Sequence, residues 1–62
     1  MEVFVNGRTV EIRNDGNIVD ALAAARINPE TVLVKRKGAL VPHDEPLKNG
    51  DRLDLITVIS GG

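Results

Sequence analysis

The sequence predicts an α+β domain in which one helix covers one face of a mixed sheet of four to five strands. Three observations lead to this class: an alternating, hairpin-like N-terminus, one alanine-rich helical segment, and β-branched segments in the second half of the chain. A helix and a sheet must each bury an apolar side, so two layers are the smallest stable arrangement. Sixty-two residues suffice for one small domain of this kind.

The N-terminal stretch MEVFVNGRTVEI alternates apolar and polar residues, which is typical of half-buried strands. Val3 and Val5 precede Asn6-Gly7, and Val10 and Ile12 follow it. Asn-Gly favours a tight turn with positive φ at both central residues. The stretch therefore predicts a β-hairpin.

The next segment, NIVDALAAARI, predicts a helix with one apolar stripe. The stripe has the spacing i, i+3, i+4, i+7 and consists of Ile18, Ala21, Leu22 and Ala25. Asn17 is a suitable N-cap, and Asp20 carries a negative charge near the positive end of the helix dipole. Pro29 is expected to end the helix, because it disfavours the helical conformation at Asn28.

Three further strands are predicted at 31–36, 39–41 and 52–60, with turns at Lys37-Gly38 and Asn49-Gly50. The order is hairpin, helix, strand, short strand, strand. The helix then crosses between strands, and the last strand is expected to lie parallel to the first, which is the β-grasp arrangement. We expect the domain at residues 1–59 and a flexible tail at 60–62.

Composition excludes several classes of function. The net charge is −1 with a pI near 5.7 and aromatic residues at 2%, which argues against a nucleic-acid interface. The absence of cysteine excludes a disulfide, a thiolate metal site and a cysteine nucleophile. No apolar run approaches the roughly 18 residues of a membrane span, and no signal-peptide pattern is present. A soluble, cytoplasmic protein is expected.

The chain ends on Gly61-Gly62, directly after a hydrophobic strand-like run. Glycine lacks a Cβ and can pass through a narrow site where a side chain would clash. The alternative is a frayed end or a cloning remnant, since termini are often disordered. The strand pattern before the glycines favours a functional tail.

The last predicted strand has apolar residues on both faces. Leu53 and Leu55 are expected to point to the helix, and Ile56 and Val58 to the opposite face. Ile59 breaks the alternation. An apolar cluster beside the tail indicates a docking surface, although single exposed apolar residues are common.

Two other residues bear on this surface. If Val32 and Val34 face the helix, Leu33 projects to the same side as the apolar cluster. Phe4 also alternates outward, and it either extends the cluster or covers an edge of the sheet.

The remaining polar candidates favour ordinary surface roles. His43 is the only histidine and is expected to face solvent in a loop. The basic run at 35–37 is expected to be a solvated turn, or to steer an acidic partner. No metal site is expected, because the spacing of the acidic residues does not match one: Asp44, Glu45, Asp51 and Asp54.

Four segments carry a family resemblance across essentially the whole chain: MEVFVNGRTVEI, VLVKRKGALVP, LKNGDRLDLI and VISGG. Together they resemble the ThiS/MoaD family of small sulfur carriers, which are ubiquitin-like β-grasp proteins, and the related archaeal small modifier proteins. A Gly-Gly that ends the chain after this strand pattern is a specific motif of the family.

The resemblance implies that the protein is a substrate and carrier and not an enzyme. A ThiF/MoeB-like adenylating enzyme would use ATP to activate the carboxylate of Gly62, with Gly61 easing passage of the tail. The resulting thiocarboxylate would deliver sulfur to a synthase for thiamine, molybdopterin or a tRNA base. By the same resemblance, the partner enzyme would bind this surface, at Leu33, Ile56, Val58, Ile59 and Phe4.

Two other functions stay open at this point. The first is a ubiquitin-like modifier joined through Gly62 to lysines of target proteins, and the second is a binding module with an inert tail. In every case we expect a monomer when free, with no stably bound cofactor and no membrane or nucleic-acid partner.

Overall fold

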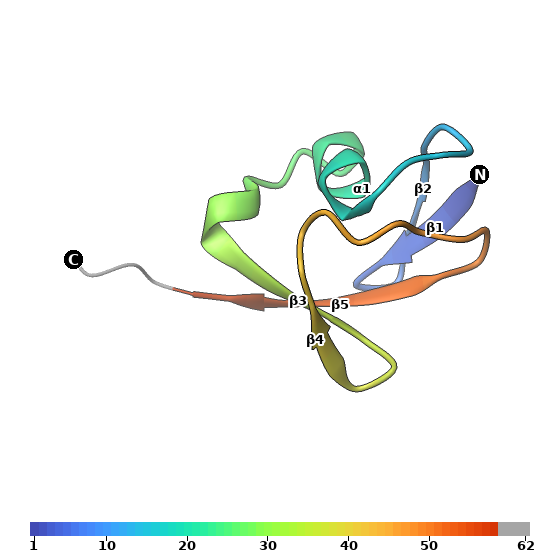
Figure 1. Cartoon of the computed structure of the whole chain (residues 1–62). Helices are drawn as coiled ribbons and strands as arrows, with labels where there is room; N and C mark the ends of the chain where they lie inside the picture. Colours follow the sequence, from blue (N-terminus) through green and yellow to red (C-terminus); the bar gives the residue numbers. More distant parts are fainter. Residues whose placement is uncertain (59–62) are drawn as a thin grey trace.

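The computed structural model describes residues 1–58. Its elements are β1 (Glu2–Val5), β2 (Arg8–Glu11), α1 (Ile18–Ala24), the 3₁₀ helix η1 (Pro29–Thr31), β3 (Val32–Arg36), β4 (Ala39–Val41) and β5 (Arg52–Thr57). The five strands form one sheet in the order β2-β1-β5-β3-β4. Helix α1 lies across one face of it (Figure 1).

The strand directions confirm the predicted mixed sheet. β1 and β5 run parallel, whereas β1–β2, β3–β4 and β3–β5 are antiparallel. The proposed boundary between a domain at 1–59 and a tail at 60–62 lies outside the described residues.

Two tight turns form as the sequence predicts. Asn6 and Gly7 have φ of 49° and 83°, and Lys37 and Gly38 have φ of 54° and 80°. Positive φ at both central residues matches the right-handed twist of the paired strands. The first turn connects β1 to β2, and the second connects β3 to β4.

Helix α1 begins as the sequence predicts. The Asn17 side chain accepts from the backbone N–H of Asp20, and the Asp20 carboxylate accepts from the N–H of Asn17. This capping box satisfies two backbone donors that the first turn leaves free. The whole predicted stripe is buried: Ile18, Ala21, Leu22 and Ala25.

The helix ends earlier than predicted, so assigning its end to Pro29 was wrong. The last helical residue is Ala24, and Arg26 adopts φ of 60°. The N–H of Ile27 donates to the carbonyl of Leu22, and the N–H of Arg26 to that of Ala23. This is a Schellman end, which needs a left-handed residue. Pro29 instead opens η1.

We expect Arg26→Gly to stabilise the protein by roughly 0.8 kcal/mol, the difference between the mid-range values of two opposing effects. Removing the Cβ relieves a left-handed conformation that costs about 1–2 kcal/mol. The greater freedom of glycine in the unfolded chain offsets roughly 0.4–1 kcal/mol of this gain. Thermal denaturation of Arg26→Gly beside Arg26→Ala provides the measurement. Because alanine keeps the Cβ, equal melting temperatures for the two variants would contradict this account of the helix end.

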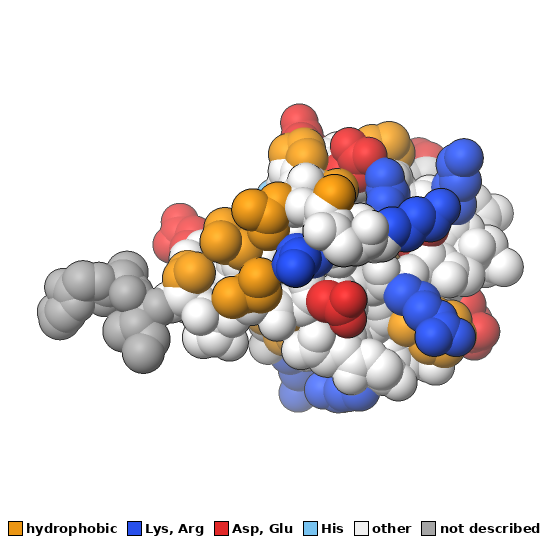
Figure 2. All heavy atoms as spheres, turned by 90° about the horizontal axis from the view of Figure 1, so that it is seen from below, with side chains coloured by type: hydrophobic (Ala, Val, Ile, Leu, Met, Phe, Trp, Pro, Cys, Tyr) orange, Lys and Arg blue, Asp and Glu red, His pale blue; other side chains and the backbone are white. Residues whose placement is uncertain are grey.

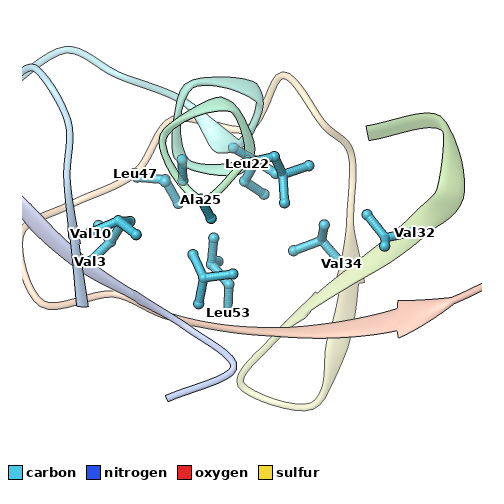
Figure 3. Packing of buried hydrophobic residues seen from close by; sticks show 11 residues of the cluster. Val3, Val10, Leu22, Ala25, Val32, Val34, Leu47 and Leu53 are labelled. Carbon is cyan, nitrogen blue, oxygen red and sulfur yellow. The ribbon is translucent and has the colours of Figure 1, made fainter. Parts of the chain in front are cut away.

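The core lies between α1 and the sheet (Figure 3). It is aliphatic and comprises Val3, Val5, Val10, Ile18, Ala21, Leu22, Ala25, Val32, Val34, Leu47 and Leu53. Leu47 comes from the long connection between β4 and β5, where the sequence pattern predicted no core residue. The N–H of Leu47 donates to the carbonyl of Gly16, which holds this connection against the start of the helix.

Candidate partner-binding face

The face of the sheet opposite α1 carries the apolar residues predicted for it. Along β5, Leu53 is 1% exposed and Leu55 is half-buried against the core, whereas Ile56 is 43% exposed. Leu33 is the register partner of Ile56 and is equally exposed, so the two side chains lie on one face. The predicted facing of this strand is therefore confirmed. Leu55 contributes less to the core than expected.

Two more residues complete an apolar patch, which we define as Leu33, Leu40, Ile56 and Val58. Val58 follows β5 and is 36% exposed, and its N–H donates to the carbonyl of Thr31, continuing the β3–β5 ladder. Figure 2 shows hydrophobic side chains gathered at the end of this face from which the chain leaves the sheet. A contiguous exposed apolar area of this kind is typical of a contact surface.

Leu40 was missed by the sequence analysis, although it is 61% exposed. It lies on β4 opposite Lys35, and therefore on the same face as Leu33 two residues earlier on β3. The available signal was the turn at Lys37-Gly38, which fixes the β3–β4 register and hence the facing of Leu40.

Phe4 lies away from the apolar patch. It pairs with Arg52, whose guanidinium carbon lies 5.4 Å from the centre of the Phe4 ring. Ile56 is four residues further along β5, which corresponds to about 13 Å. The charged pair Lys35 and Asp54 lies between them across β3 and β5. Phe4 therefore does not extend the apolar patch. It does not cover an edge of the sheet either, because β1 is an inner strand between β2 and β5.

The end of β5 is tied to the sheet on both sides as far as Leu55. The side-chain oxygen of Asn6 accepts from the N–H of Leu55 at 2.8 Å, and the N–H of Asn6 donates to the carbonyl of Leu53 at 2.9 Å. The apolar patch is thereby held in place at the start of the C-terminal segment. Three residues predicted to act there lie outside the described residues: Ile59, Gly61 and Gly62.

The prediction that His43 faces solvent was wrong. Its side chain is half-buried, and Nε2 lies 3.1 Å from the carbonyl oxygen of Val32. The His43 carbonyl accepts from the N–H of Val19 on α1. His43 thus links the β4–β5 connection to both the helix and β3, which is a structural role.

The basic run at 35–37 is not a solvated turn throughout. Arg36 donates to Glu45 at 2.6 Å and to Asp51 at 3.3 Å, and the three side chains are only 22%, 31% and 16% exposed. Asp51 also accepts from the N–H of Lys48 at 2.8 Å. The run of three basic residues in the sequence does not show that Glu45 and Asp51, 9 and 15 residues further on, form ion pairs with Arg36.

Within residues 1–58, no group of three or more histidine or acidic side chains is placed to hold a metal ion. In the same part of the chain, no helix has the length and apolar character required to cross a bilayer.

Comparisons with known proteins agree with this architecture. The thiamine biosynthesis protein ThiS from Geobacter metallireducens is 25% identical, with a TM-score of 0.72 over 100% of both chains. SAMP1 from Haloferax volcanii is 23% identical, with a TM-score of 0.69 over 98% of this chain and 97% of that one. A ubiquitin-like protein from Caldiarchaeum subterraneum is 19% identical, with a TM-score of 0.57 over 98% of this chain and 100% of that one.

These neighbours confirm the ubiquitin-like β-grasp fold. The ThiS family model matches residues 3–62, from the first buried valine of β1 to the terminal Gly-Gly. A match over nearly the whole chain shows that this protein belongs to the ThiS family.

Proposed function

We propose that this protein is a sulfur carrier whose working group is the carboxylate of Gly62. The observation that carries the proposal is the apolar patch at the end of β5, in a chain that matches the ThiS family through Gly62. Residues 59–62 span at most about 14 Å when extended. A partner that covers the patch would therefore have its reactive centre within this distance of Val58.

The chemistry requires activation, because a carboxylate is a poor electrophile. A ThiF/MoeB-like enzyme would transfer the AMP portion of ATP to the Gly62 carboxylate and release pyrophosphate. Hydrosulfide then attacks the acyl carbon, the C–O bond to AMP breaks, AMP leaves, and the thiocarboxylate and a proton are the remaining products. The carrier supplies the docking surface and the tail, and the enzyme supplies the ATP site. A sulfur-accepting synthase would take the sulfur in the next step.

Intact-protein mass spectrometry tests the proposal directly. The full chain is incubated with ATP, sulfide and an extract of the source cell, which would supply both its activating enzyme and other proteins. A mass increase equal to the exchange of one oxygen for one sulfur supports the carrier. Conjugates to lysines of other proteins, without that exchange, would identify a protein modifier instead. An unchanged mass with no conjugates would identify a binding module whose tail is inert.

Deleting Gly62 is expected to abolish adenylation while leaving the melting temperature unchanged. Among residues 1–58 the buried core side chains lie between Val3 and Leu53, and glycine has no side chain to contribute, so the deletion removes no core side chain. The carboxylate of the shortened chain would also fall one residue short, by about 3.5 Å, of the reacting phosphate. Thermal denaturation and pyrophosphate release are measured on both chains. A clear fall in melting temperature would mean that the last residue has a structural role.

A further inference from the structure

The last part of β5 is paired on one side only. The register of β1 with β5 ends at Val5 and Leu53, because the chain turns back into β2 at Asn6-Gly7. β5 continues to Thr57 with β3 along its other side. Figure 1 shows β5 running on past the end of β1 towards the C-terminus. Within residues 1–58, this stretch of β5 therefore has an edge without a neighbouring strand.

The bonds of the flanking strands identify which backbone groups lie on this edge. The carbonyls of Asp51 and Leu53 accept from β1, at 2.8 Å from the N–H of Phe4 and 2.9 Å from that of Asn6. On the other side, the N–H of Val58 donates to β3. The direction of the backbone groups alternates along a strand. The N–H and carbonyl groups of odd-numbered residues of β5 therefore point towards β1, and those of even-numbered residues point towards β3.

The backbone N–H and carbonyl groups of Leu55 and Thr57 consequently point to the side of β5 on which β1 no longer runs. The N–H of Leu55 is satisfied by the side chain of Asn6 at 2.8 Å. Three groups remain without a strand partner in the described part of the chain: the carbonyl of Leu55 and the N–H and carbonyl of Thr57. They alternate along β5 with Ile56 and Val58, whose side chains belong to the apolar patch.

A partner that covers the apolar patch and extends over the adjoining edge of β5 would also remove these three groups from water. A buried backbone donor or acceptor without a partner costs about 1–3 kcal/mol, so a partner that fits this surface must supply hydrogen bonds there. The arrangement that does so for an extended strand is another strand.

We propose that the activating enzyme adds an extended segment along the edge of β5 and bonds to Leu55 and Thr57. Residues of that segment on the open face would be apolar at alternate positions, continuing Ile56 and Val58. The added strand would hold the chain extended as it enters the active site. The inference rests on the proposed function, because it assigns the partner of the same surface.

The variant Thr57→Pro tests the edge, and Thr57→Val is its matched control. Proline removes the N–H of residue 57, and its φ is compatible with a strand edge. Since this N–H points away from β3, no ladder bond to β3 is lost. We expect both variants to melt like the wild type. We expect Thr57→Pro alone to bind the ThiF/MoeB-like enzyme about tenfold more weakly, as the loss of roughly one backbone hydrogen bond implies.

Amide hydrogen exchange provides a second measurement that does not depend on the proline variant folding. In the free full chain, the Thr57 amide should exchange faster than those of Ile56 and Val58, which face β3. Adding the enzyme with ATP should slow the exchange of Thr57. A Thr57 amide that still exchanges rapidly in the complex would overturn the inference. So would protection that rises with protein concentration alone, which would show that a second copy occupies the edge.

The outcomes also separate this inference from the proposed function. Normal adenylation of the wild type, with equal binding of Thr57→Pro and Thr57→Val, would overturn the added strand and leave the carrier function intact. Failure of the wild type to be adenylated would overturn both.

Discussion

Leu22→Ala is expected to leave the protein largely unfolded at room temperature. Leu22 is fully buried at the centre of the helix stripe, where its neighbours Ala21 and Ala25 are small. Truncating a buried leucine costs about 2–5 kcal/mol, because apolar contacts are lost and a cavity remains. A domain of this size has a total stability of only roughly 3–9 kcal/mol. Circular dichroism during thermal and urea denaturation gives the result.

Val19→Ala is the matched control on the same helix. Val19 is 41% exposed, and we expect its truncation to change the free energy of unfolding by less than about 0.5 kcal/mol. A Leu22→Ala protein that unfolds cooperatively at the wild-type temperature would show that the helix packs through another face.

Placing a charge on β5 should separate folding from partner binding. Leu53→Asp is expected to unfold the protein, because its side chain is 1% exposed among the apolar residues of the core and an unpaired buried charge is strongly unfavourable. Ile56→Asp should fold, at a cost of up to about 1 kcal/mol from the lower strand propensity of aspartate. It should nevertheless bind the activating enzyme poorly, because docking would bury the charge.

Thr9→Asp places the same charge elsewhere on the open face. Thr9 is exposed on β2 opposite Phe4, away from the apolar patch. We expect it to melt and bind like the wild type, with melting temperature and enzyme affinity measured on all three variants. If Ile56→Asp binds normally, the apolar patch is not the docking surface. If Leu53→Asp folds, β5 does not face the helix as described.

Local patterns in the sequence were sufficient where neighbouring residues decide the conformation. Asn6-Gly7 and Lys37-Gly38 predicted the two hairpin turns, since glycine readily takes the positive φ that a two-residue turn requires. Asn17 predicted the start of the helix because its capping partner lies only three residues away. The alternation in β5 likewise predicted which side of the strand carries the exposed apolar residues, as the side-chain period of a strand is two.

The tertiary structure decided whatever depends on residues that are distant in sequence. Arg36 contacts Glu45 and Asp51, and His43 contacts Val32, only because the β4–β5 connection packs against the start of α1 and beside β3. No local pattern encodes these pairings, since each needs the positions of at least two elements.

The early end of α1 has a different cause, because the hydrogen bonds that close it join residues only three and five positions apart. A left-handed Arg26 is intrinsically unfavourable, so local propensity argued for a longer helix. The edge of β5, by contrast, depends on residues that are distant in sequence. The sequence by itself determined the strand and its two faces, but only the point at which β1 turns away decided which backbone groups remain available to a partner. The place where pairing between β1 and β5 stops depends on how these two strands, which are separated by most of the chain, pack in the folded sheet.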